Sequence, residues 1–233
     1  MRVSYAEVRG SAIVHNVQEL RRLSRGVPLL GVVKAEAYGH GAVEVARLLE
    51  AQGVRWLGVA FLEEALRLRQ AGVKAAILVM GGLREPAEVP EVAEHGLRVA
   101  ISDLGALRTL GRWARHRERR IPVHLKVDTG MGRLGVTSKD LPRCLEALRE
   151  EPLELEGIMS HLAAADVDPE YTWEQIGRFQ EALGMAQRFG LRPRVNHLAN
   201  SAALLHGGYP PVSYTHLRAH ETEADLVCRL LLE

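Results

Sequence analysis

Lys34 lies in the segment VVKAEAYGHG, directly after a run of apolar residues and before Tyr38 and two glycines. The run 29–33 has the composition of a buried strand, so Lys34 is expected at the carboxyl end of that strand. In parallel α/β folds this end carries the catalytic groups. A lysine partly removed from water is more easily neutral, and a neutral amine forms Schiff bases with carbonyl groups. A lysine that merely extends its amine from a strand end into solvent has the same spacing, and that alternative stays open.

A second group of polar residues lies in the segment KVDTGMGRLG, which places Lys126 and Arg133 at the end of another apolar run, 122–127. Its three glycines formally match the GxGxxG pattern of dinucleotide-binding proteins. That pattern usually opens a helix directly and belongs to the first strand–helix unit, whereas this motif follows the fifth predicted strand and further residues intervene. The glycines rather predict a backbone bent to admit a ligand, with Arg133 placed to bind an oxyanion or a carboxylate.

Two further predicted strands end in polar residues. His161 follows the sixth strand in MSHLAAAD, and the segment HLANSAA after the seventh contains His197, Asn200 and Ser201. Ser201 could donate to a phosphate where the next helix begins. Each of these residues taken alone is most often structural, as a buried histidine or a helix cap. Because the carboxyl ends of parallel strands meet at one edge, their recurrence predicts one shared site.

Composition and absent motifs exclude several classes of protein. The 30 basic and 29 acidic residues give a net charge of +1, so no nucleic-acid or membrane-surface partner is expected. No segment approaches the roughly 20 apolar residues of a membrane-spanning helix, and no signal peptide is visible, which predicts a soluble, cytoplasmic protein. The two cysteines cannot build a disulfide framework or a cysteine metal site, and no metal is expected. The motifs of serine hydrolases, P-loop proteins and zinc peptidases are missing.

The hydrophobic pattern alternates between strands and helices. Apolar residues recur every three or four positions between the strands, which is typical of amphipathic helices. This alternation predicts a parallel sheet, either open and doubly wound or arranged as a (β/α)8 barrel. A helix capped by Ser11 and a short strand over 3–8 are expected before the repeat begins. The seven predicted strands are 29–33, 55–59, 76–80, 97–101, 122–127, 153–159 and 194–198.

The repeating pattern ends after Leu205. Glycines and prolines within 207–211 interrupt it, and no eighth strand is predicted in the segment that follows. The sequence SYTHLRAHETEADLVCRLLLE resembles the translation of a cloning or adapter junction. Residues 212–233 are therefore expected to be an artefactual tail, unrelated to the domain formed by residues 1–211. An ordinary C-terminal helix is the alternative.

Several segments taken together resemble the N-terminal barrel domain of alanine racemases over roughly residues 2–206: VVKAEAYGHG, WLGVAFLEEALRLRQAG, KVDTGMGRLG, SHLAAAD and HLANSAA. The resemblance implies a (β/α)8 TIM-type barrel, here incomplete with about seven strands and without the β-rich C-terminal domain of the family. It implies pyridoxal 5′-phosphate as the cofactor and an isomerase reaction that interconverts L- and D-alanine for cell-wall D-alanine supply. Full-length members of the family act as homodimers.

The resemblance also assigns roles to individual residues. Lys34 would carry the cofactor and act as the base on one face of the substrate, and Arg133 would contact the cofactor's phenolic oxygen and the substrate carboxylate. Lys126 matches a lysine that many members carbamylate to orient that arginine. Tyr38 and Ser201 would bind the cofactor phosphate. His161 and His197 would belong to the polar network near the pyridine nitrogen and the second catalytic group, and Asn200 would flank that network. His161 would also be a catalytic residue.

The chain departs from the family pattern in three places. Glu36 stands where the family usually has Asn or Asp. The family's eighth-strand RPGI segment, whose arginine contacts the pyridine nitrogen, has no counterpart. The family also has a tyrosine in the C-terminal domain of the partner subunit, which serves the opposite face of the substrate, and this tyrosine has no counterpart in the sequence either. The chain alone is therefore expected to lack racemase turnover. A single-domain protein that binds the cofactor without turnover, and a non-catalytic fragment that binds none, are the alternatives.

Overall fold

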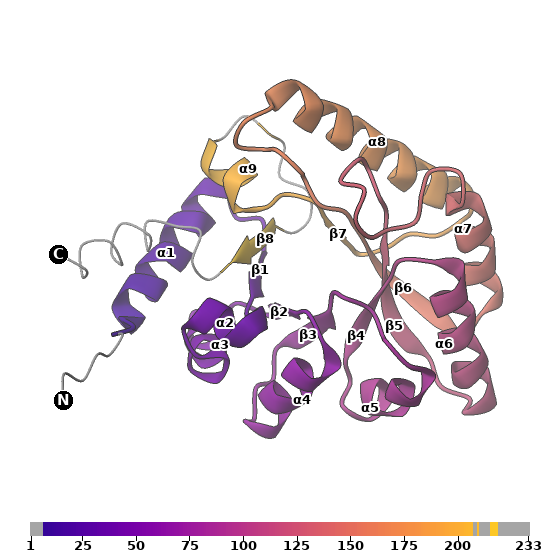
Figure 1. The fold of residues 1–233 in the computed structure, drawn as a ribbon, viewed down its shortest axis with the longest axis horizontal. Helices are drawn as coiled ribbons and strands as arrows, with labels where there is room; N and C mark the ends of the chain where they lie inside the picture. The colour runs from indigo at the N-terminus through magenta and orange to yellow at the C-terminus, as the bar shows by residue number, and fades with distance from the viewer. Residues whose placement is uncertain (1–6, 207–208, 210–214, 219–233) are drawn as a thin grey trace.

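One curved, all-parallel sheet organises the chain, with its strands in the order β7-β6-β5-β4-β3-β2-β1-β8 (Figure 1). The computed structural model describes residues 7–206, 209 and 215–218. Within these residues β7 and β8 are the two edges of the sheet, so the barrel is not closed. The predicted incomplete (β/α)8 barrel is therefore confirmed.

The seven predicted strands are all present, and each predicted boundary lies within one residue of the observed one. Their pattern was readable because side chains alternate between two environments. In β3, for example, Ile77 and Val79 face the layer between sheet and helices, whereas Leu78 faces the barrel interior. The strands are β1 (Leu29–Val32), β2 (Trp56–Val59), β3 (Ala76–Val79), β4 (Arg98–Ile101), β5 (Ile121–Lys126), β6 (Leu153–Met159) and β7 (Val195–His197).

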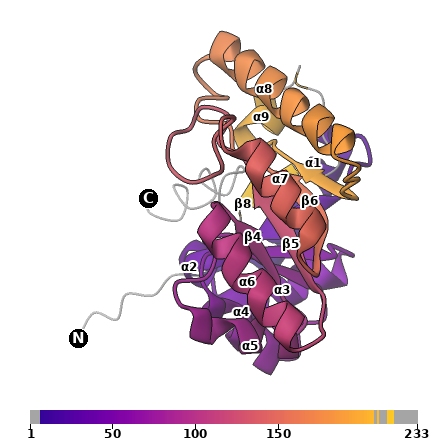
Figure 2. The ribbon, with the colours of Figure 1, turned by 90° about the vertical axis from the view of Figure 1, so that its right-hand side faces the viewer.

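The helices pack around the outside of the sheet (Figure 2). Their apolar stripes face it; α6, for example, buries Leu107, Leu110 and Ala114. The helices are α1 (Gly10–Leu23), α2 (Lys34–Gly39), α3 (Ala42–Ala51), α4 (Leu62–Gln70), α5 (Val89–Glu94), α6 (Leu104–His116), α7 (Leu141–Glu150), α8 (Pro169–Arg188) and α9 (Ser201–His206), with a 3-10 turn at Pro86–Glu88.

The start of the chain differs from the expectation. Helix α1 begins at Gly10, so Ser11 lies inside the helix and cannot cap it; the capping position is occupied by Arg9, without a side-chain hydrogen bond. The predicted strand over 3–8 falls mostly outside the described residues, and its last two residues are not in a strand.

The end of the chain adds an element that the hydrophobic pattern did not predict. Residues Thr215–Arg218 form β8, which pairs in parallel with β1, with Leu30 opposite His216. This is the side of β1 on which the eighth strand of a closed barrel would lie. The strand belongs to the segment 212–233, whose assignment to an unrelated tail stays a prediction.

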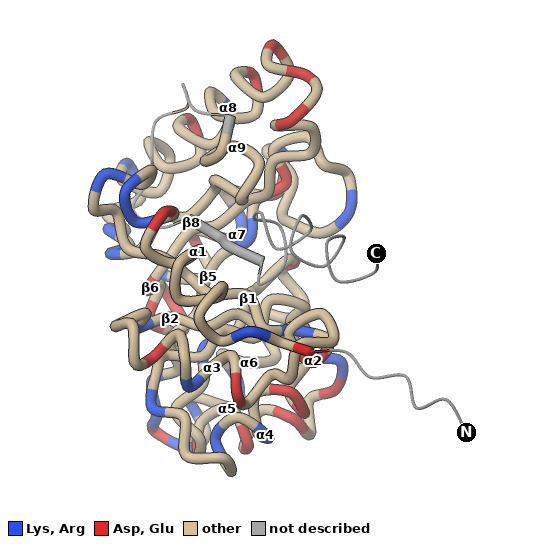
Figure 3. Tube along the Cα trace, turned by 90° about the vertical axis from the view of Figure 1, so that its left-hand side faces the viewer, with Lys and Arg blue, Asp and Glu red and all other residues tan. Residues whose placement is uncertain are grey.

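Charge is dispersed over the surface. Figure 3 shows basic and acidic residues interspersed along the helices and loops of the face that it presents. In the described part of the chain, no helix has both the length and the apolar composition needed to cross a bilayer.

We predict that Gly157→Ala destabilises the fold by about 1–3 kcal/mol, because a methyl group must be forced into a filled space. Gly157 lies where the register between β5 and β6 shifts. A Cβ atom there would come within 2.6 Å of both the His124 Nδ1 and the Val195 carbonyl oxygen. The free energy of unfolding is measured by urea denaturation.

The matched control is Gly177→Ala in α8, where a Cβ atom would meet nothing within 4 Å. Alanine in this helix interior is expected to stabilise by about 0.5–1 kcal/mol. Equal stability of Gly157→Ala and the unchanged chain would contradict the predicted close contact.

Candidate active site

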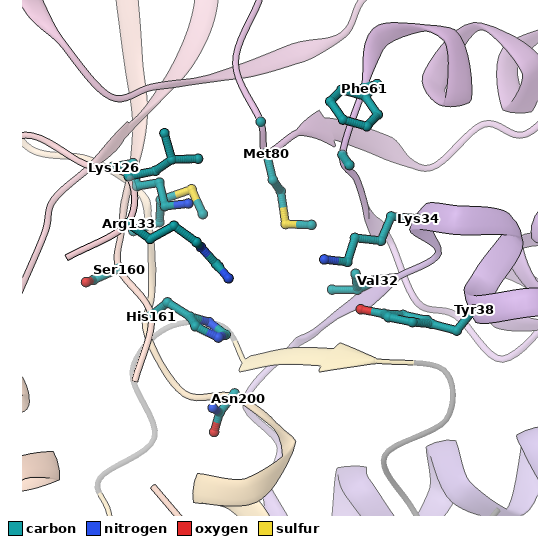
Figure 4. Close-up of a pocket in the computed structure, with 14 residues that line it drawn as sticks. Val32, Lys34, Tyr38, Phe61, Met80, Lys126, Arg133, Ser160, His161 and Asn200 are labelled. Carbon is teal, nitrogen blue, oxygen red and sulfur yellow. The ribbon is translucent and has the colours of Figure 1, made fainter. Parts of the chain in front are cut away.

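A cavity of about 280 Å³ lies at the carboxyl ends of the strands. Lys34 and Tyr38 reach it from one side, and Arg133 and His161 from the other (Figure 4). Six of the eight residues predicted for the site line this cavity, and His197 and Ser201 do not. The lining consists of Val32, Lys34, Tyr38, Ala60, Phe61, Met80, Gly81, Lys126, Arg133, Leu134, Met159, Ser160, His161 and Asn200.

Lys34 is followed by a left-handed turn. The four residues from Ala35 to Tyr38 all have φ between 49° and 57°, which costs roughly 1–2 kcal/mol per residue for L-amino acids. Backbone hydrogen bonds hold the turn, including Ala37 N to Val33 O at 3.0 Å. Because the turn winds back, the Lys34 Nζ lies 5.8 Å from the centre of the Tyr38 ring. The two residues thus enter the cavity together.

The carboxylate of Glu64 fastens this turn to the end of β2. Its Oε1 accepts a hydrogen bond from Ala35 N at 2.6 Å, and its Oε2 accepts from Ala60 N at 2.7 Å and Phe61 N at 3.0 Å. Charge-assisted bonds of this kind are among the stronger ones in proteins, and they offset part of the cost of the left-handed backbone. Sequence reasoning missed Glu64, because a glutamate in the first turn of a helix is ordinarily only a cap.

Glu36 lies on the outer side of the same turn. It forms an ion pair with Arg67 and accepts a hydrogen bond from Ala42 N at 3.3 Å. Glu36 does not line the cavity. Glu36, where the resemblance implies Asn or Asp, therefore supports the turn and does not line the site.

The glycine-rich loop after β5 brings Arg133 to the opposite side of the cavity. The loop doubles back, so that Val136 N donates to Lys126 O at 2.7 Å. At Gly135, with φ of 142°, a Cβ atom would lie 2.6 Å from Asp128 N, so only glycine allows this close approach. The next helix, α7, begins at Leu141 and not at the last glycine. The loop is bent as predicted, whereas binding of an oxyanion or a carboxylate by Arg133 stays a prediction. The dinucleotide alternative lacks the helix that it requires.

Lys126 is buried at the end of β5, with 8% of its surface exposed. Burial lowers the pKa of its amine, and the positive charges of Arg133 and Lys34 lower that pKa further; Asp128 opposes the shift. The neutral, nucleophilic form of Lys126 is therefore populated at lower pH than for an exposed lysine.

Asn200 connects the loops that follow β6 and β7. Its Nδ2 donates to Leu162 O at 3.3 Å, and its Oδ1 accepts from Ala203 N at 3.0 Å, which caps α9. Ser201 is fully buried where α9 begins, as expected from the sequence. Asn200 thus both lines the cavity and caps α9.

His197 lies in the barrel interior and belongs to a buried polar chain that sequence reasoning missed. Its Nε2 is 2.7 Å from His124 Nδ1, and His124 Nε2 is 3.5 Å from Glu156 Oε2. Glu156 in turn accepts from Arg98 Nε at 3.0 Å. The signal was present as His124 and Glu156 among the apolar residues of two predicted strands, but their proximity depends on pairing between strands.

The protonation of this chain follows from its surroundings. Burial lowers the pKa of His124, which outweighs the opposing effect of Glu156. A neutral His124 that directs its Nε2–H at Glu156 has a free Nδ1 lone pair, which accepts the Nε2–H of His197. Burial alone would raise the pKa of Glu156, but hydrogen bonds from His124 and Arg98 bring it to about 2. His197 is thereby fixed in orientation and tautomer.

The chain is similar to known alanine racemases. The family described as alanine racemase, N-terminal domain, matches residues 8–219. The alanine racemase of Symbiobacterium thermophilum is 42% identical over 94% of this chain, and that of Sorangium cellulosum is 45% identical over 88%. The crystal structure of alanine racemase from Streptomyces lavendulae superposes with a TM-score of 0.84 at 35% identity, covering 92% of this chain and 57% of that one.

A second solved structure, alanine racemase from Bacillus anthracis with bound L-Ala-P, gives a TM-score of 0.84 at 32% identity, covering 93% of this chain and 58% of that one. The chain spans just over half the length of the curated relatives that it matches, 58% for Symbiobacterium thermophilum and 56% for Sorangium cellulosum. The family match extends into the segment 212–233.

We predict that Glu156→Gln removes a pH-dependent part of the stability. The folded-state pKa of about 2 lies below the ordinary 4.5, so the stabilisation is complete above about pH 4.5 and is lost as the pH falls towards 2. It amounts to at most about 3 kcal/mol. Urea unfolding from pH 7 downwards should show a shallower acid loss in Glu156→Gln.

The control is Glu154→Gln, two residues earlier in β6, where a half-exposed carboxylate pairs with Arg194. This variant is expected to keep the acid dependence of the unchanged chain. An identical slope in Glu156→Gln and the unchanged chain would contradict the assignment.

Proposed function

This chain belongs to the family of alanine racemase N-terminal domains, and we propose that it is the cofactor-binding barrel of an enzyme that interconverts L- and D-alanine with pyridoxal 5′-phosphate. The observation that carries the proposal is the placement of Lys34 and Arg133 on opposite sides of one cavity at the carboxyl ends of the strands. The relatives named alanine racemase support alanine as the substrate. Supply of D-alanine for the cell wall is the role that we propose for the product.

The residues around the cavity fit this cofactor. Pyridoxal phosphate carries an aldehyde, which an amine can bind, and a phosphate and a phenolic oxygen, which need cationic or hydroxyl partners. The cavity offers the amine of Lys34, the guanidinium of Arg133, the hydroxyl of Tyr38 and the second amine of Lys126. The bound cofactor supplies an electron sink that stabilises negative charge at the α-carbon of an amino acid.

The residues of the chain then have separate tasks. The Nζ of Lys34 holds the cofactor and exchanges a proton with the α-carbon on one face of the substrate. Arg133, fixed by the glycine-rich loop, binds the substrate carboxylate and the phenolic oxygen. Tyr38, which lines the cavity, would bind the phosphate, and His161 and Asn200 would border the ring. Ser201 is buried outside the cavity lining, and the resemblance to the family alone gives it the same phosphate role. His197 does not line the cavity, and we assign it a supporting role beneath the site, where its contact with His124 fixes its orientation.

Racemisation needs one acid–base group on each face of the α-carbon. Lys34 supplies one of them. By resemblance to the family, we propose that the other comes from the C-terminal domain of a second copy in a homodimer. Within this proposal, the residues of the barrel account for proton exchange on one face of the α-carbon.

We predict that Lys34 alone is labelled when the chain is incubated with pyridoxal phosphate and reduced with borohydride. Peptide mass mapping should place the pyridoxyl group on the peptide that contains Lys34, and Lys34→Ala should abolish it. Lys74, an exposed lysine away from the cavity, is the internal control. Labelling spread over several lysines would overturn the site assignment.

The same samples distinguish a racemase barrel from a protein that binds the cofactor without turnover. By its resemblance to the family, Lys34 serves the D face, so α-deuterated D-alanine should lose deuterium to water in the unchanged chain and not in Lys34→Ala. Labelling of Lys34 without any loss of deuterium would favour a protein that binds the cofactor without turnover.

We further predict that Lys126 is carbamylated. Its neutral amine adds to carbon dioxide and loses a proton, and the resulting carbamate converts repulsion with Arg133 into attraction. The carbamate signal of carbon-13-labelled bicarbonate, followed by NMR, should appear at a lower pH than the carbamate signal of an exposed lysine, because the pKa of Lys126 is lowered. It should vanish in Lys126→Ala and persist in the exposed-site control Lys139→Ala. A signal retained in Lys126→Ala would refute the assignment.

A further inference from the structure

We propose that Gln175, in the first half of α8, is a positioning residue that fixes the Arg133 loop and the His161 segment relative to each other. The inference deepens the proposed function and rests on it for its catalytic meaning. Gln175 does not line the cavity, and it would act through the two segments that do.

The side chain of Gln175 is completely buried and bonds to both segments. Its Nε2 donates to Thr129 Oγ1 at 3.2 Å in the loop that carries Arg133. The same nitrogen donates to His161 O at 3.1 Å, and Oε1 accepts from Ala163 N at 2.8 Å. An amide has two N–H donors and one oxygen. All three groups therefore face the two cavity-lining segments.

The bond to Thr129 continues into the site. Thr129 Oγ1 lies 2.8 Å from Ser160 Oγ, and Ser160 Oγ donates to Val127 O at 2.7 Å. The hydroxyl proton of Ser160 is used in its bond to Val127 O, so the hydroxyl of Thr129 must donate its own proton to Ser160 Oγ. Towards Gln175 Nε2, Thr129 Oγ1 can then act only as an acceptor. The hydrogen bonds thus run in one direction from α8 to Ser160, which lines the cavity directly before His161.

Two other residues of α8 hold only one of these segments. Tyr171 donates through its hydroxyl to Gly130 O at 2.6 Å, and Arg178 donates through Nη1 to Thr129 O at 3.0 Å. Both act on the Arg133 loop. Among these three α8 residues, Gln175 is the one that also bonds to the His161 segment. Its loss should therefore loosen two parts of the site at once.

Thr172 offers a matched structural control. It is equally buried in α8, but its hydroxyl donates to Asp168 O at 2.7 Å, within the same helix end. Thr172→Val removes a buried hydrogen bond whose acceptor, Asp168 O, lies outside both segments. A general loss of stability would appear in this variant as well, whereas a loss of positioning would not.

The first measurement is hydrogen–deuterium exchange of the chain without added cofactor. In Gln175→Glu, the carboxylate can still accept from Ala163 N but cannot donate to Thr129 or His161. Exchange should accelerate several-fold in both 128–136 and 160–166, and in neither segment of Thr172→Val. Thr129→Val, a milder change, should accelerate the same two segments and keeps the test valid if Gln175→Glu does not fold.

The second measurement is the affinity for pyridoxal phosphate, followed by absorbance at equal fractions of folded protein. The dissociation constant should rise about tenfold in Gln175→Glu, the order expected for one to two lost hydrogen bonds, and stay unchanged in Thr172→Val. The effects of Gln175→Glu and Thr129→Val should be less than additive, because they break one chain of bonds.

The outcomes separate the two proposals. Absence of cofactor binding at Lys34 in the unchanged chain would overturn the proposed function, while the exchange measurement would still report on Gln175. Normal binding together with unchanged exchange and affinity in both Gln175→Glu and Thr129→Val would overturn the positioning role alone.

Discussion

The crowding of cationic side chains at one end of the sheet is the constraint on which the site depends. Lys34, Lys126 and Arg133 come from the ends of two strands and line one cavity, and the pKa of Lys126 is lowered by burial and by both of the other charges. The requirement on such a set is that the repulsion be relieved, by solvent at the exposed Arg133, by a negative group in the shared space, or by loss of a proton from one amine. The proposed cofactor phosphate, substrate carboxylate and carbamate all meet this requirement, which is why an anionic carbonyl compound suits the cavity.

The fold supports this crowding with rigid backbone on each side. The left-handed turn after Lys34 is costly, and hydrogen bonds from Ala35, Ala60 and Phe61 to one carboxylate of Glu64 offset that cost. On the opposite side, glycines allow the loop to return onto β5. Beneath the cavity, the interior of the barrel is polar where His124, His197 and Glu156 meet. The hydrogen bonds from His197 to His124 and from Arg98 to Glu156 are strengthened by the low dielectric, and His124 Nε2 faces Glu156 at 3.5 Å.

The sequence predicted the strands and the residues at their ends, and it failed where contacts depend on pairing between distant segments. Lys34, Arg133 and His161 were found because parallel strands bring their carboxyl ends to one edge. His124 and Glu156 were missed because their meeting depends on the register of β5 and β6, which shifts at Gly157. The turn at 35–38 was unpredictable, since its residues are not glycine. Gln175 was hidden because a glutamine in an amphipathic helix carries no signal of what it bonds to.

Within the described residues, β7 and β8 are the two edge strands of the sheet and do not pair with each other. β7 has only three residues and pairs with β6 alone within the described chain. Yet the segment after β7 carries Asn200 and Ser201, to which we assign cofactor contacts, and Asn200 is tied back to the rest of the fold through Leu162. A ligand that binds there would connect the segment after β7 to Lys34, which begins α2 directly after β1, across the two sheet edges that no backbone pairing joins. A ligand stabilises the state that binds it. Cofactor binding should therefore stabilise β7 and the segment after it against local unfolding, because the cofactor would contact both that segment and Lys34.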